Sequence, residues 1–184
     1  MDNKINKKKL LLWGLIKFAE CELFGFFIFL FFIAVSKALG TFGNILFGSV
    51  GMITIICVMA DFGLKQGEKA RNKVNLHGEK PCRNFGLAIG SAAMLPSYIM
   101  LILLALSKAG IIGNFLPAYK LLNACFFPLI DLVAHTADVN QMNPYVFILF
   151  AVMPLFYLLS SWISFKWGYD QIDPEDKIIY KHSK

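Results

Sequence analysis

Three long stretches of the chain are uncharged and mostly apolar, and each is long enough to cross a bilayer as a helix. They lie between Lys37 and Asp61, between Arg83 and Lys108, and between Asp138 and Lys166. About 18 or more apolar residues span the hydrocarbon core as a helix, whereas a buried helix of a soluble domain rarely runs so far without a charge. The pattern therefore predicts an all-α membrane protein that crosses the bilayer several times.

A fourth apolar stretch, residues 10–36, precedes these three. It carries Lys17, Glu20 and Glu22 in its first half and is purely apolar from Leu23 to Ser36. We interpret it as one long helix whose first turns lie at the headgroups, with Lys17 one helical turn from Glu20. The spanning part then begins near the end of the charged segment.

The four stretches predict a bundle of four transmembrane helices in a single domain, residues 1–184. Hydrophobic residues make up 57% of the chain and charged residues 16%, compared with about 25% charged residues in a soluble domain. The polar segments between the stretches are too short to form a second core. We expect spans at about 21–36, 41–60, 85–106 and 144–165, a polar loop at 61–84 and a C-terminal tail at 166–184.

Lysines and arginines collect in segments that four crossings place on one side. Because such residues stay in the cytoplasm when they flank membrane spans, we expect the loop at 61–84 and both termini to be cytoplasmic. The cations on this side are four in the N-terminal segment, six in the loop and four in the tail: Lys4, Lys7, Lys8, Lys9, Lys65, Lys69, Arg71, Lys73, Lys80, Arg83, Lys166, Lys177, Lys181 and Lys184.

The stretch 111–134 admits two interpretations. Its longest uncharged piece, 121–130, is too short to span, which favours a re-entrant or interfacial segment on the outer face. An internal repeat favours a fifth crossing: SKALGTFGNIL at 36–46 recurs, with one deletion, as SKAGIIGNFL at 107–116. A true duplication would make 113–134 a span and place the tail outside. We favour four crossings plus a re-entrant segment and keep the short fifth helix as the alternative.

Glycines are expected to bring the helices into close contact, because helix association in lipid depends on packing of small residues. Gly86 and Gly90 form a GxxxG pair at the start of the third span, and Gly43, Gly48 and Gly51 lie in the second. We therefore predict these five as helix-packing positions.

One group of side chains has the spacing of a metal site. Asp131, His135 and Asp138 are separated by four and three residues, which places them on one face if a helix continues through Thr136 and Ala137. Two carboxylates and an imidazole on such a face form an incomplete metal or proton-relay site. A membrane-embedded metal-dependent enzyme using these three residues is the alternative function, although a polar helix end is the simpler explanation.

The sequence gives no motif for a cofactor. Cys21, Cys57, Cys82 and Cys125 lack the CxxC spacing of a zinc or redox site, and no glycine-rich loop for nucleotides follows a strand. Positive-inside topology already explains the net charge of +6, so nucleic acid is not an expected partner. The expected partners are the bilayer, a homo-oligomer or larger membrane complex, and anionic inner-leaflet lipids at Lys65, Lys69, Arg71 and Lys73.

The end of the chain resembles that of a group of other proteins. Lys166-Trp167-Gly168-Tyr169, followed by Ile178-Ile179-Tyr180-Lys181, is similar to the ending of small uncharacterised multi-pass membrane proteins of Gram-positive bacteria. The resemblance covers the C-terminal tail and implies a location in a bacterial plasma membrane without implying an activity. With no catalytic motif in the spans, we expect a non-enzymatic protein, a subunit or accessory factor of a membrane complex or transport system.

Overall fold

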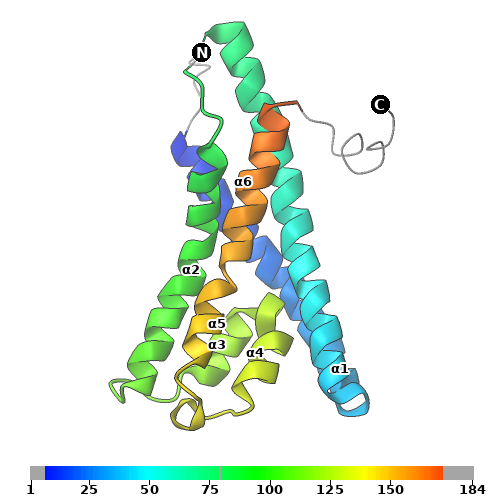
Figure 1. Ribbon diagram of the computed structural model, residues 1–184, viewed down its shortest axis with the longest axis vertical. Coiled ribbons are helices and arrows are strands. Elements are labelled where there is room, and N and C mark those ends of the chain that lie inside the picture. Colours follow the sequence, from blue (N-terminus) through cyan, green and yellow to red (C-terminus); the bar gives the residue numbers. More distant parts are fainter. Residues whose placement is uncertain (1–6, 79, 172–184) are drawn as a thin grey trace.

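The computed structural model describes residues 7–78 and 80–171, which form helices joined by short loops (Figure 1). Two long helices come first, followed by several short ones and a final helix that is broken near its start. In chain order they are α1 (Lys7–His77), α2 (Phe85–Lys108), α3 (Leu116–Leu122), the 3-10 turn η1 (Ala124–Phe126), α4 (Phe127–Ala134), the 3-10 turn η2 (Val139–Gln141), α5 (Val146–Val152) and α6 (Leu155–Tyr169).

Helix α1 contains two antiparallel limbs joined by a tight reversal. Gly40 has φ 51° and ψ −134°, a conformation that glycine adopts without steric cost. The limbs Lys8–Val35 and Ala38–Leu76 are each long and apolar enough to span a membrane. Rings from both limbs are in contact near the reversal and at the other end, Phe32 with Phe47 and Trp13 with Phe62.

The predicted all-α bundle of four spans is confirmed by length and composition. Besides the two limbs of α1, α2 qualifies as a span, and so does Val146–Tyr169, which comprises α5 and α6. A break at Met153 and Pro154 separates those last two helices, because proline cannot supply the N–H that would continue the helical hydrogen bonds. By contrast, α2 continues through Pro96.

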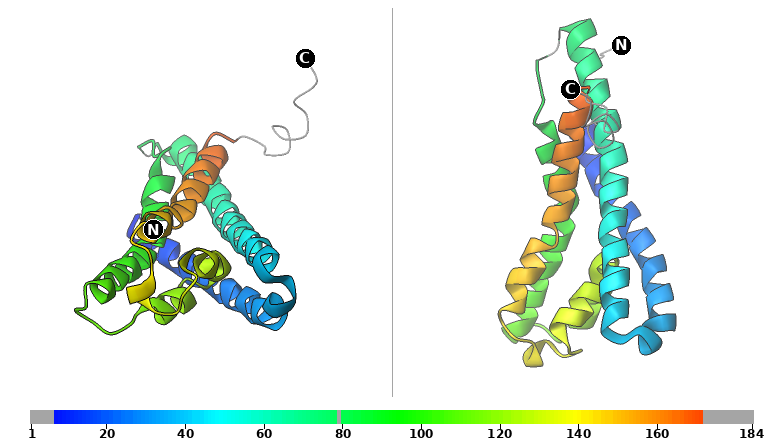
Figure 2. Two further views of the ribbon diagram at one scale, coloured as in Figure 1. Left: turned by 60° about the horizontal axis from the view of Figure 1, so that its bottom comes forward. Right: turned by 45° about the vertical axis from the view of Figure 1, so that its right-hand side comes forward.

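The stretch 116–134 forms a bent pair in which α3 and the η1–α4 segment are inclined by 100°. Figures 1 and 2 show that the chain enters this pair from the end of α2 and leaves it toward α5 at the same end of the bundle. The pair is therefore a re-entrant segment, and we call that end, which also holds the reversal at Gly40, the hairpin end. The opposite end, with Lys7 and Tyr169, is the terminal end.

The first limb agrees with the helix expected over residues 10–36, with Lys17, Glu20 and Glu22 inside it, but one other element boundary differs from that expected. The segment expected as a polar loop, 61–84, continues α1 as far as His77. The reason is that its charges alternate with small and apolar residues such as Gly63, Gly67 and Ala70, which are buried in the bundle.

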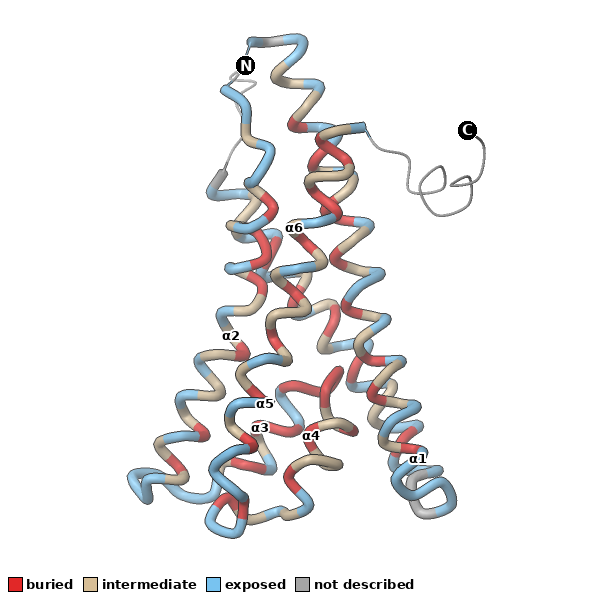
Figure 3. The backbone as a smooth tube through the Cα atoms, in the orientation of Figure 1, coloured by how far each residue is buried: buried red, intermediate tan, exposed pale blue. Residues whose placement is uncertain are grey.

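Burial concentrates on the faces that the helices turn toward one another (Figure 3). A large cluster surrounds the re-entrant segment and includes Ile55, Phe126 and Tyr157. A smaller cluster, with Phe62 and Phe165, lies nearer the terminal end. Large apolar side chains on the outside are those expected to contact lipid.

The repeated SKA motif marks two turns at the hairpin end. Gly40 lies two residues after the first SKA and Gly110 lies directly after the second, and both have positive φ. After the turns the two copies diverge, because residues 41–76 form a straight limb whereas 111–134 form a loop and the bent pair. The similarity is therefore carried by the turns, and the second copy has no spanning helix of its own.

Candidate functional site at the re-entrant tip

The re-entrant segment turns at Asn123, between α3 and η1. Its backbone, at φ −118° and ψ 56°, leaves the helical region and ends α3. Pro117 and Pro128 each occupy the first turn of a helix, α3 and α4, where a missing N–H breaks no helical hydrogen bond. The prolines that prevent one continuous span thus favour two short helices. We call Ala124–Phe126 the re-entrant tip.

Two glycines of α1 make room for this tip. A Cβ atom on Gly25 would lie 2.3 Å from the backbone nitrogen of Cys125, and one on Gly51 would lie 2.0 Å from its carbonyl oxygen. Atoms do not approach so closely, so neither position accepts a side chain without displacement of the backbone. The tip is therefore inserted between the two limbs of the α1 hairpin.

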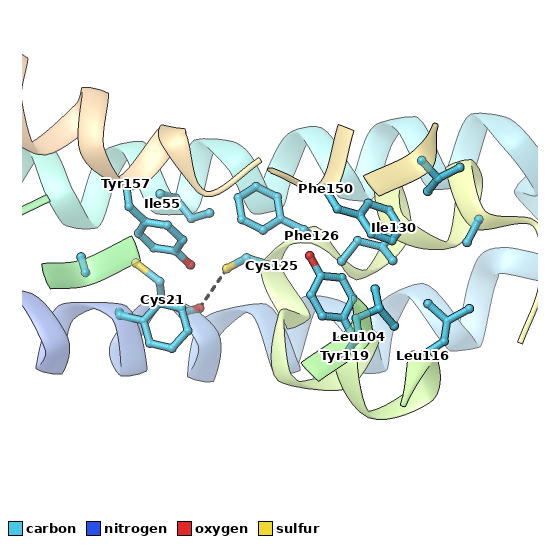
Figure 4. Close-up of a cluster of buried hydrophobic side chains, with 14 of the residues drawn as sticks. Cys21, Ile55, Leu104, Leu116, Tyr119, Cys125, Phe126, Ile130, Phe150 and Tyr157 are labelled. Atoms are coloured by element: carbon cyan, nitrogen blue, oxygen red, sulfur yellow. Dashed lines mark hydrogen bonds between the residues drawn. The ribbon is translucent and has the colours of Figure 1, made fainter. Parts of the chain in front are cut away.

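Glu22 is a carboxyl side chain in contact with the tip. Its Oε1 accepts a hydrogen bond from the Tyr157 hydroxyl at 2.8 Å, and its Oε2 accepts one from the Cys125 backbone N–H at 3.3 Å. The Cys125 thiol donates to the carbonyl oxygen of Cys21 at 3.0 Å, as Figure 4 shows. Glu22, Cys21, Cys125 and Tyr157 form what we call the Glu22 cluster.

The Glu22 cluster lies midway along the bundle. Glu22 is at the middle of the candidate span Lys8–Val35, and Tyr157 is at the middle of the candidate span Val146–Tyr169. Because these two midpoints are joined by a hydrogen bond, both side chains lie near the centre of the membrane-spanning region. The cluster thus joins the first span, the re-entrant tip and the last span.

A second set of polar contacts holds the non-helical backbone at Asn123, between α3 and η1. The buried Ser97 hydroxyl, in α2, donates to Oδ1 of Asn123 at 2.7 Å. The Asn123 amide donates in turn to the carbonyl oxygen of Tyr119 at 3.0 Å. These bonds supply partners for polar groups that lipid cannot satisfy, which is a condition for a non-helical backbone at this depth.

Asp131, His135 and Asp138 do not share a helix face. Helix α4 ends at Ala134, and His135 has a left-handed backbone with φ 50°. Asp131 accepts from Lys120 at 2.6 Å, while Asp138 accepts from the backbone N–H of Asn140 at 2.9 Å. The continuous helix that a metal site on these residues requires is not formed. Within residues 7–78 and 80–171, no group of three or more histidine, cysteine or acidic residues is placed to hold a metal ion.

Two lysines instead organise the loops at the hairpin end. The Lys108 ammonium group donates to the carbonyl oxygens of Val139, Asn140 and Met142 at 2.8–3.0 Å. Lys120, whose side chain is only 8% exposed, donates to the carbonyl oxygen of Thr136 as well as to Asp131. Both cations thereby neutralise backbone dipoles and one carboxylate close to the re-entrant segment.

The glycines singled out in the sequence have unequal roles. Gly86 and Gly90 lie against α6, where a Cβ would come within 2.6 Å of Phe165 and 2.7 Å of Leu158, respectively. Gly48 lies against Leu129 of the re-entrant segment, and Gly51 lies against its tip. A Cβ on Gly43 would meet Leu39, in its own helix.

Other close helix contacts were not anticipated, because their glycines form no motif within one helix. Gly63 and Gly67 of α1 face Gly168 and its neighbours in α6, while Gly14 faces Ile89 of α2. Gly25, which lies against Cys125, is another glycine of this kind. Each of these glycines matches a partner far away in the sequence, so no spacing along the chain reveals it.

The four cations proposed to meet lipid lie on the part of α1 that extends toward the terminal end. Lys65 pairs with Asp61 at 2.6 Å, and the Arg71 guanidinium lies 5.5 Å from the centre of the Tyr169 ring. Lys69 is exposed and Lys73 is half-buried. The N-terminal cation Lys4 and the tail from residue 172 onward, including Ile178–Lys181, lie outside the described residues.

Fold and composition place the chain in the class of multi-pass α-helical integral membrane proteins, with a re-entrant segment inserted among four spans. Comparison with protein-family models, curated proteins and solved structures finds no match to it.

Proposed function

We propose that this chain is a non-enzymatic subunit or accessory factor of a membrane complex or transport system. The observation that carries the proposal is the insertion of the re-entrant tip between the limbs of α1. Re-entrant backbone in membranes is either buried in protein or lines a water-filled cavity. Here the tip is in direct contact with Gly25 and Gly51, so the middle of this single chain is packed rather than open.

The outer faces are then the surfaces available for association. Phe27 and Phe31 on the first limb are 53% and 68% exposed, and Ile102 on α2 is 62% exposed. A thin bundle of this kind buries little of its apolar surface, which supports association with a second copy or with another membrane protein.

The plasma membrane of a bacterium is the proposed location, with both termini in the cytoplasm. The resemblance of the C-terminal tail to proteins of Gram-positive bacteria supports the bacterial plasma membrane. The positive-inside rule supports the cytoplasmic termini, because Lys65, Lys69 and Arg71 belong to the terminal end of the bundle. These residues and Lys73 are also the proposed contacts for anionic lipid headgroups, at about 1 kcal/mol per basic residue.

Native mass spectrometry of the chain extracted from its own membrane in a mild detergent tests this proposal. We expect a complex heavier than the monomer, and anionic lipids retained in preference to zwitterionic ones. Replacing Lys65, Lys69, Arg71 and Lys73 by Gln should abolish the lipid preference and leave the complex intact. A monomer without preferred lipid, or substrate turnover by the purified chain, would contradict the proposal.

A further inference from the structure

A carboxyl group near the centre of the bilayer needs compensation for its charge. Moving an ionised side chain to that depth is costly, and such groups occur where they pair with a cation or take part in ion or proton movement. Lys17, on the same helix as Glu22, is already engaged, because its ammonium group donates to Glu20 at 2.5 Å. The Cys125 amide and the Tyr157 hydroxyl, which donate hydrogen bonds to Glu22, are neutral groups.

The groups around Glu22 are suited to a proton and poorly suited to a metal ion. Cys125 and Tyr157 direct N–H and O–H donors at the carboxyl oxygens, whereas a cation needs oxygen lone pairs directed toward it. The Cys21 carbonyl, which could supply such a lone pair, accepts from the Cys125 thiol. A proton needs no coordination shell, and the Tyr157 hydroxyl can accept from a protonated carboxyl as readily as it donates to an ionised one.

The titratable and charged neighbours of Glu22 come from four elements. On α1 they are Cys21 and, about one turn toward the terminal end, the Lys17–Glu20 pair. Tyr119 acts from α3, Cys125 from η1 and Tyr157 from α6. The phenols and thiols are weak acids that are neutral at physiological pH, so among these groups Glu22 itself is the one whose charge is not balanced by a partner.

Two further charged side chains of α1 lie between Glu22 and the terminal end. The Glu20 side chain is 37% exposed and that of Lys17 is 18% exposed. At two and five residues before Glu22, they project from other sides of α1 and pair with each other. A proton that binds one oxygen of the Glu22 carboxylate removes its charge.

We propose that Glu22 is a membrane-embedded proton-binding site, closed by the re-entrant tip. Because the tip supplies the Cys125 amide and covers the carboxyl, movement of the tip changes the environment in which the proton is held. Proton binding and the position of the re-entrant segment are therefore coupled, and by linkage each affects the other. This inference depends on the geometry of the Glu22 cluster and not on the identity of a partner in the proposed complex.

Infrared spectroscopy of the full chain in lipid tests the proposal. At neutral pH exposed carboxyl groups are ionised, so a protonated carboxyl band reports a group such as Glu22. We expect one such band, which vanishes reversibly on alkalinisation. Glu22→Gln should lose it, whereas Glu20→Gln, with a change two residues away, should keep it.

Wild-type chain made with carboxyl-13C glutamate provides a measurement that does not depend on the folding of a variant. The band should shift to lower frequency, because a heavier carbon slows the C=O stretch, and it should keep this shift in Glu20→Gln. A spectrum with no glutamate carboxyl band at neutral pH would overturn the proposal. Loss of the band on adding Na⁺ at constant pH would also overturn it, in favour of a cation site.

Discussion

The charged residues near the start of α1 differ in how the bundle accommodates them. Lys17 and Glu20 form an ion pair at the predicted spacing, so two charges within the first limb neutralise each other. Glu22 instead points to the re-entrant tip and to Tyr157. The sequence suggested that all three lie near the headgroups, because a cluster of charges before an apolar run is typical of an interfacial helix start. The tip, about 100 residues farther along the chain, supplies a backbone N–H that bonds to the Glu22 carboxyl group in the middle of a span.

Lys120 and Asp131 form the ion pair with the most buried cation in the described part of the chain. Asp131→Asn removes the carboxylate that balances the buried Lys120 ammonium group and leaves its hydrogen bond to the carbonyl oxygen of Thr136, so the variant should lose stability. Because Asp131 is 42% exposed, we expect about 1–2 kcal/mol, less than for a fully buried pair. Thermal unfolding of the variant and the wild type in detergent measures this loss of stability.

The matched control is Asp61→Asn, which breaks the pair with Lys65. Both of those side chains are more than half exposed, so the loss should stay below about 1 kcal/mol. Equal destabilisation by the two variants would show that the pair at the re-entrant segment has no special structural role.

Among the elements, the four spans were predicted well, because each is a long apolar run bounded by charged residues. It also favoured the re-entrant form of residues 113–134, since Pro117, Lys120 and Pro128 interrupt the apolar pattern. The depth and bend of that segment were beyond sequence reasoning. They depend on Gly25 and Gly51, which lie in separate limbs and are recognisable as a pair only once the limbs are side by side.

Helices α2 and α6 are in close contact at Gly90. Replacing Gly90 by Leu should separate the two helices, because even a Cβ at that position would lie 2.7 Å from the backbone of Leu158. Overpacking typically costs about 1–3 kcal/mol, so the unfolding temperature in detergent should fall clearly.

Ser91→Leu is the appropriate control, since Ser91 is exposed on the same helix. The neighbouring Ile89 is unsuitable because it is fully buried. If Gly90→Leu and Ser91→Leu unfold at the same temperature, the GxxxG face does not hold α2 against α6.

In the whole molecule, four spans and a re-entrant segment place the start of α1 and the end of α6 at the same end of the bundle (Figure 1). The repeated SKA turns fit this arrangement, because both lie at the hairpin end, where they reverse the chain direction. The distribution of lysine and arginine then predicts which end is cytoplasmic. The Glu22 cluster, the part of the molecule with the clearest chemistry, had no counterpart in any sequence motif.

The re-entrant bundle is tested most directly by the sidedness of the two segments that flank residues 116–134. Single cysteines are introduced in a cysteine-free chain at Gly113 and Asn140, both exposed, and at His182 in the tail. An impermeant thiol reagent is then added to intact cells. We expect labelling at Gly113→Cys and Asn140→Cys, and labelling at His182→Cys only after the cells are opened. Labelling of Gly113→Cys but not Asn140→Cys, together with a labelled tail, would mean that residues 116–134 cross the membrane and would contradict the re-entrant bundle.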